Sequence, residues 1–157
     1  MAKRSKVETA LTIRQIEDAA LQQILTLGYD NMSYSTLAQA TGISRTGISH
    51  HFPRKIDFLL ALNSRIAAFF VSALDFCDIE QFERSWLTAL ESTERRAVLR
   101  LFFNFCARAG VEVQQFEAIE LTRSQARRHF GDAGCRLVSE LLGRSAVKLL
   151  AEQRLAA

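Results

Sequence analysis

The sequence has very few residues that interrupt helices: one proline and seven glycines in 157 residues. Runs in which β-branched residues alternate with polar ones, as strands require, are also missing. Both absences favour an all-α chain of long helices. A chain of this length can bury one substantial core, or combine a small module with a helical body.

Long hydrophobic runs are absent as well. The longest, Ile66 to Leu74, contains Ser72 and falls far short of the ~20 residues that a membrane-spanning helix needs. No apolar stretch follows the basic start M-A-K-R-S-K, so it does not have the pattern of a signal peptide. Three cysteines without a C-x-x-C pair indicate reduced thiols. We therefore expect a cytoplasmic protein that does not bind a membrane.

The patterns that carry catalysis or bind metals are missing too. We find no nucleophile–base arrangement, no glycine-rich phosphate loop and no metal-ligand spacing, which excludes the common enzyme classes. His50 and His51 are adjacent, so on a helix they point apart, and no cysteine pair lies nearby. The sequence predicts neither an enzyme nor a cofactor. Redox sensing by a cysteine stays open.

The net charge is only +3, but it is unevenly distributed. Residues 1–65 contain eight Lys or Arg against five Asp or Glu, and residues 66–157 contain twelve of each. The whole excess of positive charge therefore lies in the first part of the chain, where a polyanion would bind.

The most informative stretch runs from Ser33 to Phe52 and predicts two short helices joined by a tight turn. Ser33 and Ser44 are suited to cap the starts of the helices 34–41 and 45–51, because their hydroxyls can accept unpaired backbone N–H groups. Gly42 is suited to the left-handed turn between them. The second helix has an outer face that is polar and free of acids. This is the pattern of a helix-turn-helix with its recognition helix.

Helices are expected on both sides of this motif. Thr12 and Gln15 have the spacing of a capping box and predict the start of a first helix, preceded by a basic arm over residues 1–10. That arm either follows a DNA groove or is simply solvated. After Pro53 a long helix should run to about Phe76. Four further helices should follow, at 79–90, 93–110, 111–130 and 133–155, with Gly131-Asp132 as the break between the last two. We place the domain boundary near residue 55, giving a DNA-binding domain over 1–55 and a regulatory and dimerisation domain over 56–157.

The run from Gly28 to Leu60 resembles the N-terminal domain of the TetR family of bacterial transcriptional regulators. It contains the family's G-Y turn, its capped helix, a G-I-S turn, and a second helix that ends in H-F and is followed by Lys55. The short length, the K-R-S-K start and the stretch S-R-T-G-I-S-H-H-F-P are similar to LuxT-type regulators. The resemblance implies a homodimer that binds a palindromic operator in double-stranded DNA, usually as a repressor. The C-terminal body would then bind an effector and form the dimer interface.

The resemblance also implies which residues contact DNA. Arg45 and Thr46 match positions where bases are read. The positions that commonly contact phosphates are matched by Ser44, Thr46, His50 and Lys55. Ser49 stands where the family usually has Tyr, and Thr46-Gly47 inverts the usual Gly-Thr. The full set of expected DNA-binding residues is Lys3, Arg4, Ser44, Arg45, Thr46, Gly47, Ser49, His50, Arg54 and Lys55.

Two further sites are expected in the second domain. An apolar effector pocket would be lined by Phe70, Trp86, Phe102, Phe103 and Cys106, although such aromatic clusters are more often core than pocket wall. A dimer interface would be formed by Phe116, Val138, Leu141, Leu142, Ala146 and Leu149, with small residues that allow close approach. Because the body is short for the family, an alternative is a DNA-bound adaptor whose body binds another protein.

Overall fold

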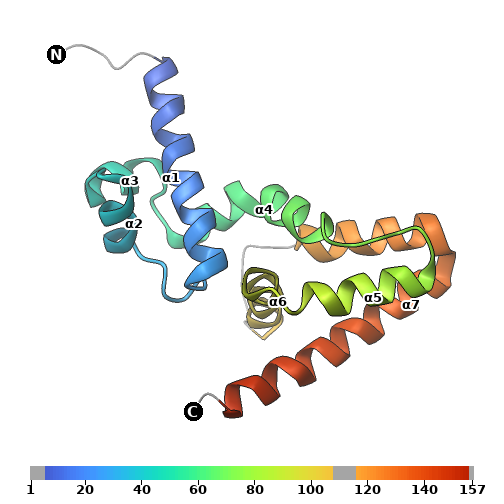
Figure 1. Cartoon of the computed structure of the whole chain (residues 1–157). Helices are drawn as coiled ribbons and strands as arrows, with labels where there is room; N and C mark the ends of the chain where they lie inside the picture. Colours follow the sequence, from blue (N-terminus) through green and yellow to red (C-terminus); the bar gives the residue numbers. More distant parts are fainter. Residues whose placement is uncertain (1–5, 108–115, 156–157) are drawn as a thin grey trace. The chain divides into compact units, whose positions relative to one another are not determined.

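The computed structural model describes residues 6–107 and 116–155, and within these ranges every regular element is a helix (Figure 1). The prediction of an all-α fold is confirmed. None of the helices described is both long enough and apolar enough to cross a membrane. The helices are α1 (Lys6–Thr26), α2 (Tyr34–Thr41), α3 (Arg45–His51), α4 (Lys55–Val71), α5 (Ile79–Ala89), α6 (Thr93–Cys106) and α7 (Glu117–Leu155).

The chain divides into two compact units between Leu62 and Asn63, inside α4. The sequence placed this boundary near residue 55, which is the first residue of the same helix. The first unit therefore contains α1 to α3 and the beginning of α4. The second contains the rest of α4 and α5 to α7.

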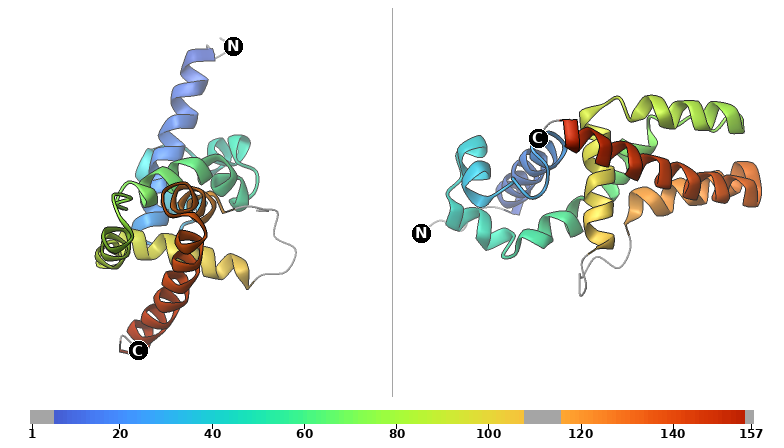
Figure 2. Two further views of the ribbon diagram at one scale, coloured as in Figure 1. Left: turned by 90° about the vertical axis from the view of Figure 1, so that its right-hand side faces the viewer. Right: turned by 90° about the horizontal axis from the view of Figure 1, so that it is seen from below.

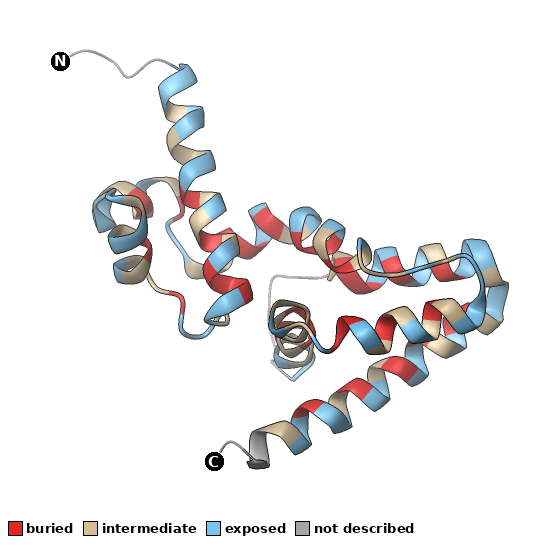
Figure 3. Cartoon of the chain, viewed as in Figure 1, coloured by how far each residue is buried: buried red, intermediate tan, exposed pale blue. Residues whose placement is uncertain are grey.

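The first unit is held together by one apolar core, in which α2 packs against both α1 and α3. The ring of Phe52 stacks on that of Phe58 with centroids 4.6 Å apart, which joins the end of α3 to α4. The buried apolar side chains of this unit are Ile16, Ala20, Ile24, Leu25, Met32, Leu37, Ile48, Phe52, Phe58, Leu59 and Leu62 (Figure 3).

The first helix begins earlier than the sequence indicated. Residues from Lys6 onward are already helical, so the arm predicted over residues 1–10 is shorter than expected. Thr12 does not cap a helix: its hydroxyl donates to the carbonyl of Glu8, one turn back within α1. A threonine inside a helix, bonded to the preceding turn, can also have a glutamine three residues later. The spacing of Thr12 and Gln15 therefore did not distinguish a helix interior from a helix start. Near the end of α1, Leu25 is buried, whereas Leu27, just after the helix, is 49% exposed.

In the second unit α7 packs against α5 and α6. Trp86 is fully buried, lies edge-on to Phe70, and donates its indole N–H to the Ser145 hydroxyl at 3.0 Å. The Ser145 hydroxyl in turn donates to the Leu141 carbonyl at 2.6 Å. These bonds give a buried indole and a buried hydroxyl the partners they need, and they fix α5 on α7.

The last helix turns back on itself at Gly131, where φ is 61° and ψ is −145°, as the predicted break required (Figures 1 and 2). Only glycine adopts such a backbone conformation readily. Three residues later a Cβ on Gly134 would overlap the carbonyl of Ala126, so the two halves of α7 approach each other closely beside the corner.

Other expected helix limits need correction. The helix after Pro53 ends at Val71 rather than near Phe76, and residues 72–78 form a connection before α5. Helix α6 ends at Cys106 rather than Gly110, and its last turns are only partly buried. Of the residues of α6, only Val98, Leu99 and Leu101 are buried. The first residues of the helix predicted from Val111, up to residue 115, lie outside the described residues.

Candidate nucleic-acid interface

The turn between α2 and α3 is fixed by capping at both helix starts. Ser33 and Thr36 form a reciprocal capping box at the start of α2, and the Ser44 hydroxyl accepts from the backbone N–H of Gly47 at the start of α3. Between them Gly42 has φ of 72° and ψ of 4°, a left-handed conformation that other residues adopt only with strain. The caps and the turn predicted from the sequence are confirmed, and they set the angle at which α3 leaves α2.

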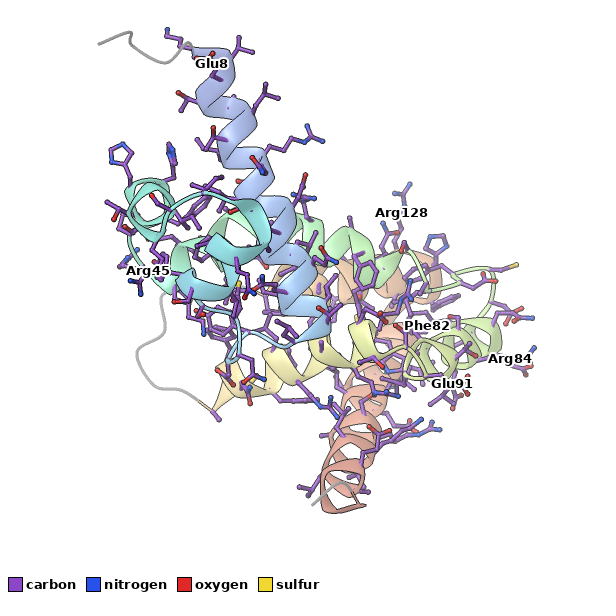
Figure 4. The ribbon with its side chains drawn as sticks, turned by 60° about the vertical axis from the view of Figure 1, so that its left-hand side comes forward. Glu8, Arg45, Phe82, Arg84, Glu91 and Arg128 are labelled. Carbon is purple, nitrogen blue, oxygen red and sulfur yellow. The ribbon has the colours of Figure 1, made fainter. Side chains whose placement is uncertain are left out.

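Helix α3 presents an exposed face without any acidic residue. Arg45, Thr46 and His50 are all exposed, whereas Ile48 on the opposite side is fully buried. Arg45 projects from the outer side of this helix (Figure 4). A short helix that buries one side and offers a guanidinium, a hydroxyl and an imidazole on the other can contact base edges and phosphates in a major groove.

Gly47 and Ser49 are used partly within the helix itself. A Cβ at Gly47 would lie 3.1 Å from the Ile43 Cγ2 atom and 3.3 Å from the Ser44 hydroxyl, so a side chain here would crowd the turn. The Ser49 hydroxyl donates to the carbonyl of Thr46, and the residue is half-buried. Both positions therefore offer less to a ligand than Arg45 or His50 does.

The two cations after α3 have intramolecular partners. Arg54 forms an ion pair with Asp57, with 2.7 Å between the Nη2 and Oδ1 atoms, and the other carboxylate oxygen of Asp57 accepts from the Arg54 backbone N–H. The hydrogen bond from the Arg54 side chain is the main reason that the pKa of Asp57 lies below its usual value. Arg54 was expected among the DNA-binding residues. Its carboxylate partner was not predicted, although R-K-I-D has the i, i+3 spacing of a helix-start cap.

Lys55 is held in place at the start of α4. Its ammonium group donates to the carbonyl of Asp30 at 3.0 Å and lies 4.7 Å from the centre of the Tyr29 ring. These two contacts limit where the ammonium group can lie, so its positive charge is held at the start of α4, directly after α3.

Tyr34 was not singled out in the sequence, yet it connects the two helices of the motif. Its hydroxyl donates to the carbonyl of Phe52, directly after α3, and its pKa is raised, first by burial and then by the charge of Asp57. His51 is half-buried, with its ring 5.2 Å from that of His50. Lys3 and Arg4 lie outside the described residues.

The aromatic residues expected to line an effector pocket form two sets of ring contacts. Phe70 and Trp86 contact each other in the core, and Phe102 contacts Phe103 and Phe116. Cys106, also expected in the lining of this pocket, is exposed. Clusters of three or more residues able to hold a metal ion do not occur in the part of the chain that the structure describes.

The residues expected at a dimer interface fall into two groups. Val138, Leu141 and Leu149 are buried inside their own chain, and therefore contribute almost nothing to its surface. Leu142, Ala146 and Phe116 are half-buried. Next to them, Val147 and Leu150 are 71% and 53% exposed.

Comparison with protein families assigns both units. Residues 16–62 match a family described as bacterial regulatory proteins of the tetR family. Residues 63–149 match the tetracycline repressor LuxT C-terminal domain. The junction of the two matches coincides with the division of the structure between Leu62 and Asn63. A search of curated proteins gave no match.

Proposed function

The chain belongs to the TetR family of bacterial regulatory proteins, with a C-terminal domain of the LuxT type, and from this we propose that it represses transcription as a homodimer bound to a palindromic operator. At the coarser level the protein is a DNA-binding transcriptional regulator. The proposal adds that the protein is a dimer, that its operator is palindromic, and that it represses transcription. It also adds that a small molecule bound in the second unit releases the protein from DNA. It also assigns the protein to the cytoplasm, where a bacterial regulator meets the chromosome.

The observation that carries the proposal is the exposed, acid-free face of α3, held at a fixed angle by two capped helix starts and Gly42. In our proposal Arg45 and Thr46 read base edges, and His50 and Lys55 contact the DNA backbone on either side. Arg54 is a weaker candidate, because its ion pair with Asp57 would have to open or be shared with a phosphate.

For the dimer we propose the second half of α7. Gly143, Ala146, Val147 and Leu150 follow each other at steps of three, one and three residues, which is one stripe of a helix. This stripe lies beside the buried one, so α7 has both buried and exposed bands along its second half (Figure 3). Its small residues would allow the same helix of a second chain to approach closely, in a two-fold arrangement that matches a palindrome.

The first test is selection of bound fragments from sheared genomic DNA by the purified protein in moderate salt, followed by sequencing. We expect a shared palindrome whose half-sites are about one helical turn apart. Affinity for it should fall steeply with salt, because each phosphate contact releases a counterion. Fragments that share no motif would contradict an operator-reading function.

The dimer is tested separately by sedimentation. Replacing Val147 and Leu150 together with glutamate should give a monomer that keeps its helical content, because both side chains are exposed in the single chain. The matched control is Leu60→Glu, at a similarly exposed leucine of α4. If the Val147 and Leu150 variant remains dimeric, the interface lies elsewhere.

A further inference from the structure

The second unit contains a cavity of about 340 Å³ where the connection between α4 and α5 meets the end of α5 and the start of α6. This volume is within the range of small-molecule sites in proteins. It differs from the apolar pocket that the sequence indicated, since none of those aromatic residues lines it. The lining residues are Ala73, Asp75, Gln81, Arg84, Ser85, Thr88, Ala89, Ser92 and Arg95.

The charge of this lining is positive, with two guanidinium groups against one carboxylate. The carboxylate of Asp75 already accepts a hydrogen bond from the backbone N–H of Cys77 at 2.8 Å. The Ser85 hydroxyl is also used, since it accepts from the Asp75 backbone and donates to the Phe82 carbonyl. The cations are therefore the groups of the lining with the most unused hydrogen-bonding capacity.

Arg95 is the more informative of the two. Its guanidinium lies over the ring of Phe69, with the Cζ atom 4.7 Å from the ring centre, and this contact limits where the group can lie. Its Nε atom is shielded from solvent and has no hydrogen-bond partner among the described residues. A buried donor without an acceptor is costly, and a guanidinium is shaped to bind a carboxylate or phosphate through two parallel bonds.

The carboxylate of the neighbouring Glu94 accepts from the Ser92 hydroxyl at 2.8 Å at the start of α6, and this bond is the main reason that its pKa is lowered. The charges of Arg95 and Arg96 lower this pKa further. Arg84 also belongs to the lining; it reaches outward from α5 (Figure 4), and its hydrogen bond to Gln81 is long, at 3.4 Å. Arg84 can therefore turn toward a ligand at little cost.

We infer that this cavity binds a small anionic molecule through its carboxylate or phosphate group, with Arg95 as the fixed partner and Arg84 as the mobile one. The binding site is independent of the proposed function. Only its consequence, that the anion is the effector that releases DNA, depends on that proposal.

Isothermal titration of the full chain at constant ionic strength tests the inference, with citrate and inorganic phosphate as separate probes. We expect saturable binding of at least one probe. Arg95→Gln and Arg84→Gln should each weaken it about tenfold or more, because each removes a charge-assisted hydrogen bond. Asp75→Asn should tighten it, since it removes the only negative charge of the lining and keeps an oxygen for the Cys77 N–H.

Arg128→Gln is the control. It removes the same charge as the other two substitutions, but Arg128 is exposed on α7 and does not line the cavity. Absence of saturable binding of both probes overturns the inference, as does equal weakening in the Arg128 variant. Arg84→Gln decides the question if Arg95→Gln fails to fold, since Arg84 is exposed. Operator binding is measured on the same samples without the probes, so failure of the cavity and failure of the DNA-binding function give different results.

Discussion

The Tyr34 hydroxyl donates a 2.7 Å hydrogen bond to the backbone carbonyl of Phe52, and so connects the first residue of α2 to the residue that ends α3. The ring of Tyr34 lies against Phe58 of α4, with centroids 5.8 Å apart. One side chain thus contacts both helices of the motif and the helix that follows it. The position of the recognition helix depends on this bond as well as on the turn at Gly42.

Replacing Tyr34 with Phe should lower the free energy of unfolding by about 0.5–1.5 kcal/mol, because the Phe52 carbonyl loses its donor while the ring is kept. Urea denaturation measures the change. Ser35→Ala, at an exposed position of the same helix, is the control and should be nearly neutral. An unchanged midpoint for the Tyr34 variant would mean that the bond contributes nothing net.

Tyr34 should also make stability depend on alkaline pH. Burial, and then the charge of Asp57, raise the pKa of its hydroxyl, so the folded state holds this proton more tightly than the unfolded state does. The resulting stabilisation is fully present below the unfolded-state pKa and is lost as pH rises through the folded-state pKa. Denaturation at a series of alkaline pH values should show this loss, and Tyr34→Phe should lack it. Equal pH profiles for the two proteins would argue against it.

Arg45→Ala should reduce discrimination between operator and unrelated DNA by roughly 1–3 kcal/mol, the contribution of a good bidentate contact to a base. Competition binding with both DNAs separates this effect from a general loss of charge. Arg128→Ala removes the same charge from α7 and should leave discrimination unchanged. If Arg45→Ala weakens both DNAs alike, this side chain contacts the backbone and not a base.

Ser145→Ala should destabilise the second unit by about 1–3 kcal/mol, because it leaves the buried indole N–H of Trp86 without an acceptor. Ser139 is a matched control: it also lies in α7 and donates to the carbonyl four residues earlier, but it is exposed. Ser139→Ala should be nearly neutral in thermal unfolding. Equal effects of both substitutions would contradict a specific role for the indole bond.

Gly134→Ala should cost about 1–3 kcal/mol, the usual range for forcing extra atoms into a filled space, since the new methyl group would meet the Ala126 carbonyl. Chemical denaturation gives the value. Ser124→Ala, at an exposed position of α7, should be neutral or slightly stabilising because alanine is the better helix former. If the Gly134 variant is as stable as the wild type, the two halves of α7 can move apart beside Gly131 without a cost in free energy.

Local chemistry made part of the fold predictable. Ser33, Gly42 and Ser44 each act through neighbours only two to four residues away, so their roles could be inferred from the sequence and are confirmed. Thr12 shows the limit of this reasoning, because a hydroxyl inside a helix and a hydroxyl at its start have the same local neighbours. The pairing of Trp86 with Ser145, 59 positions apart, depends on how helices pack and has no local signal.

The candidate sites follow the same division. The exposed face of α3 could be predicted, because the periodicity of a helix places Ile48 on one side and the polar residues on the other. Which apolar stripe of α7 is buried could not, since Leu141 and Leu142 are equally suited to a core and differ only in what the rest of the chain places against them. The lining of the cavity comes from three separate segments, and nothing in the sequence brings Asp75 and Arg95 together.

The buried position of Trp86 has a practical consequence. It is the chain's one tryptophan, and both tyrosines, Tyr29 and Tyr34, belong to the first unit. The emission maximum of the native protein therefore reports on the packing of the second unit alone, because the indole ring is shielded from water there. Unfolding followed by this fluorescence and by helical circular dichroism can be compared directly, and two different midpoints would mean that the two units unfold independently.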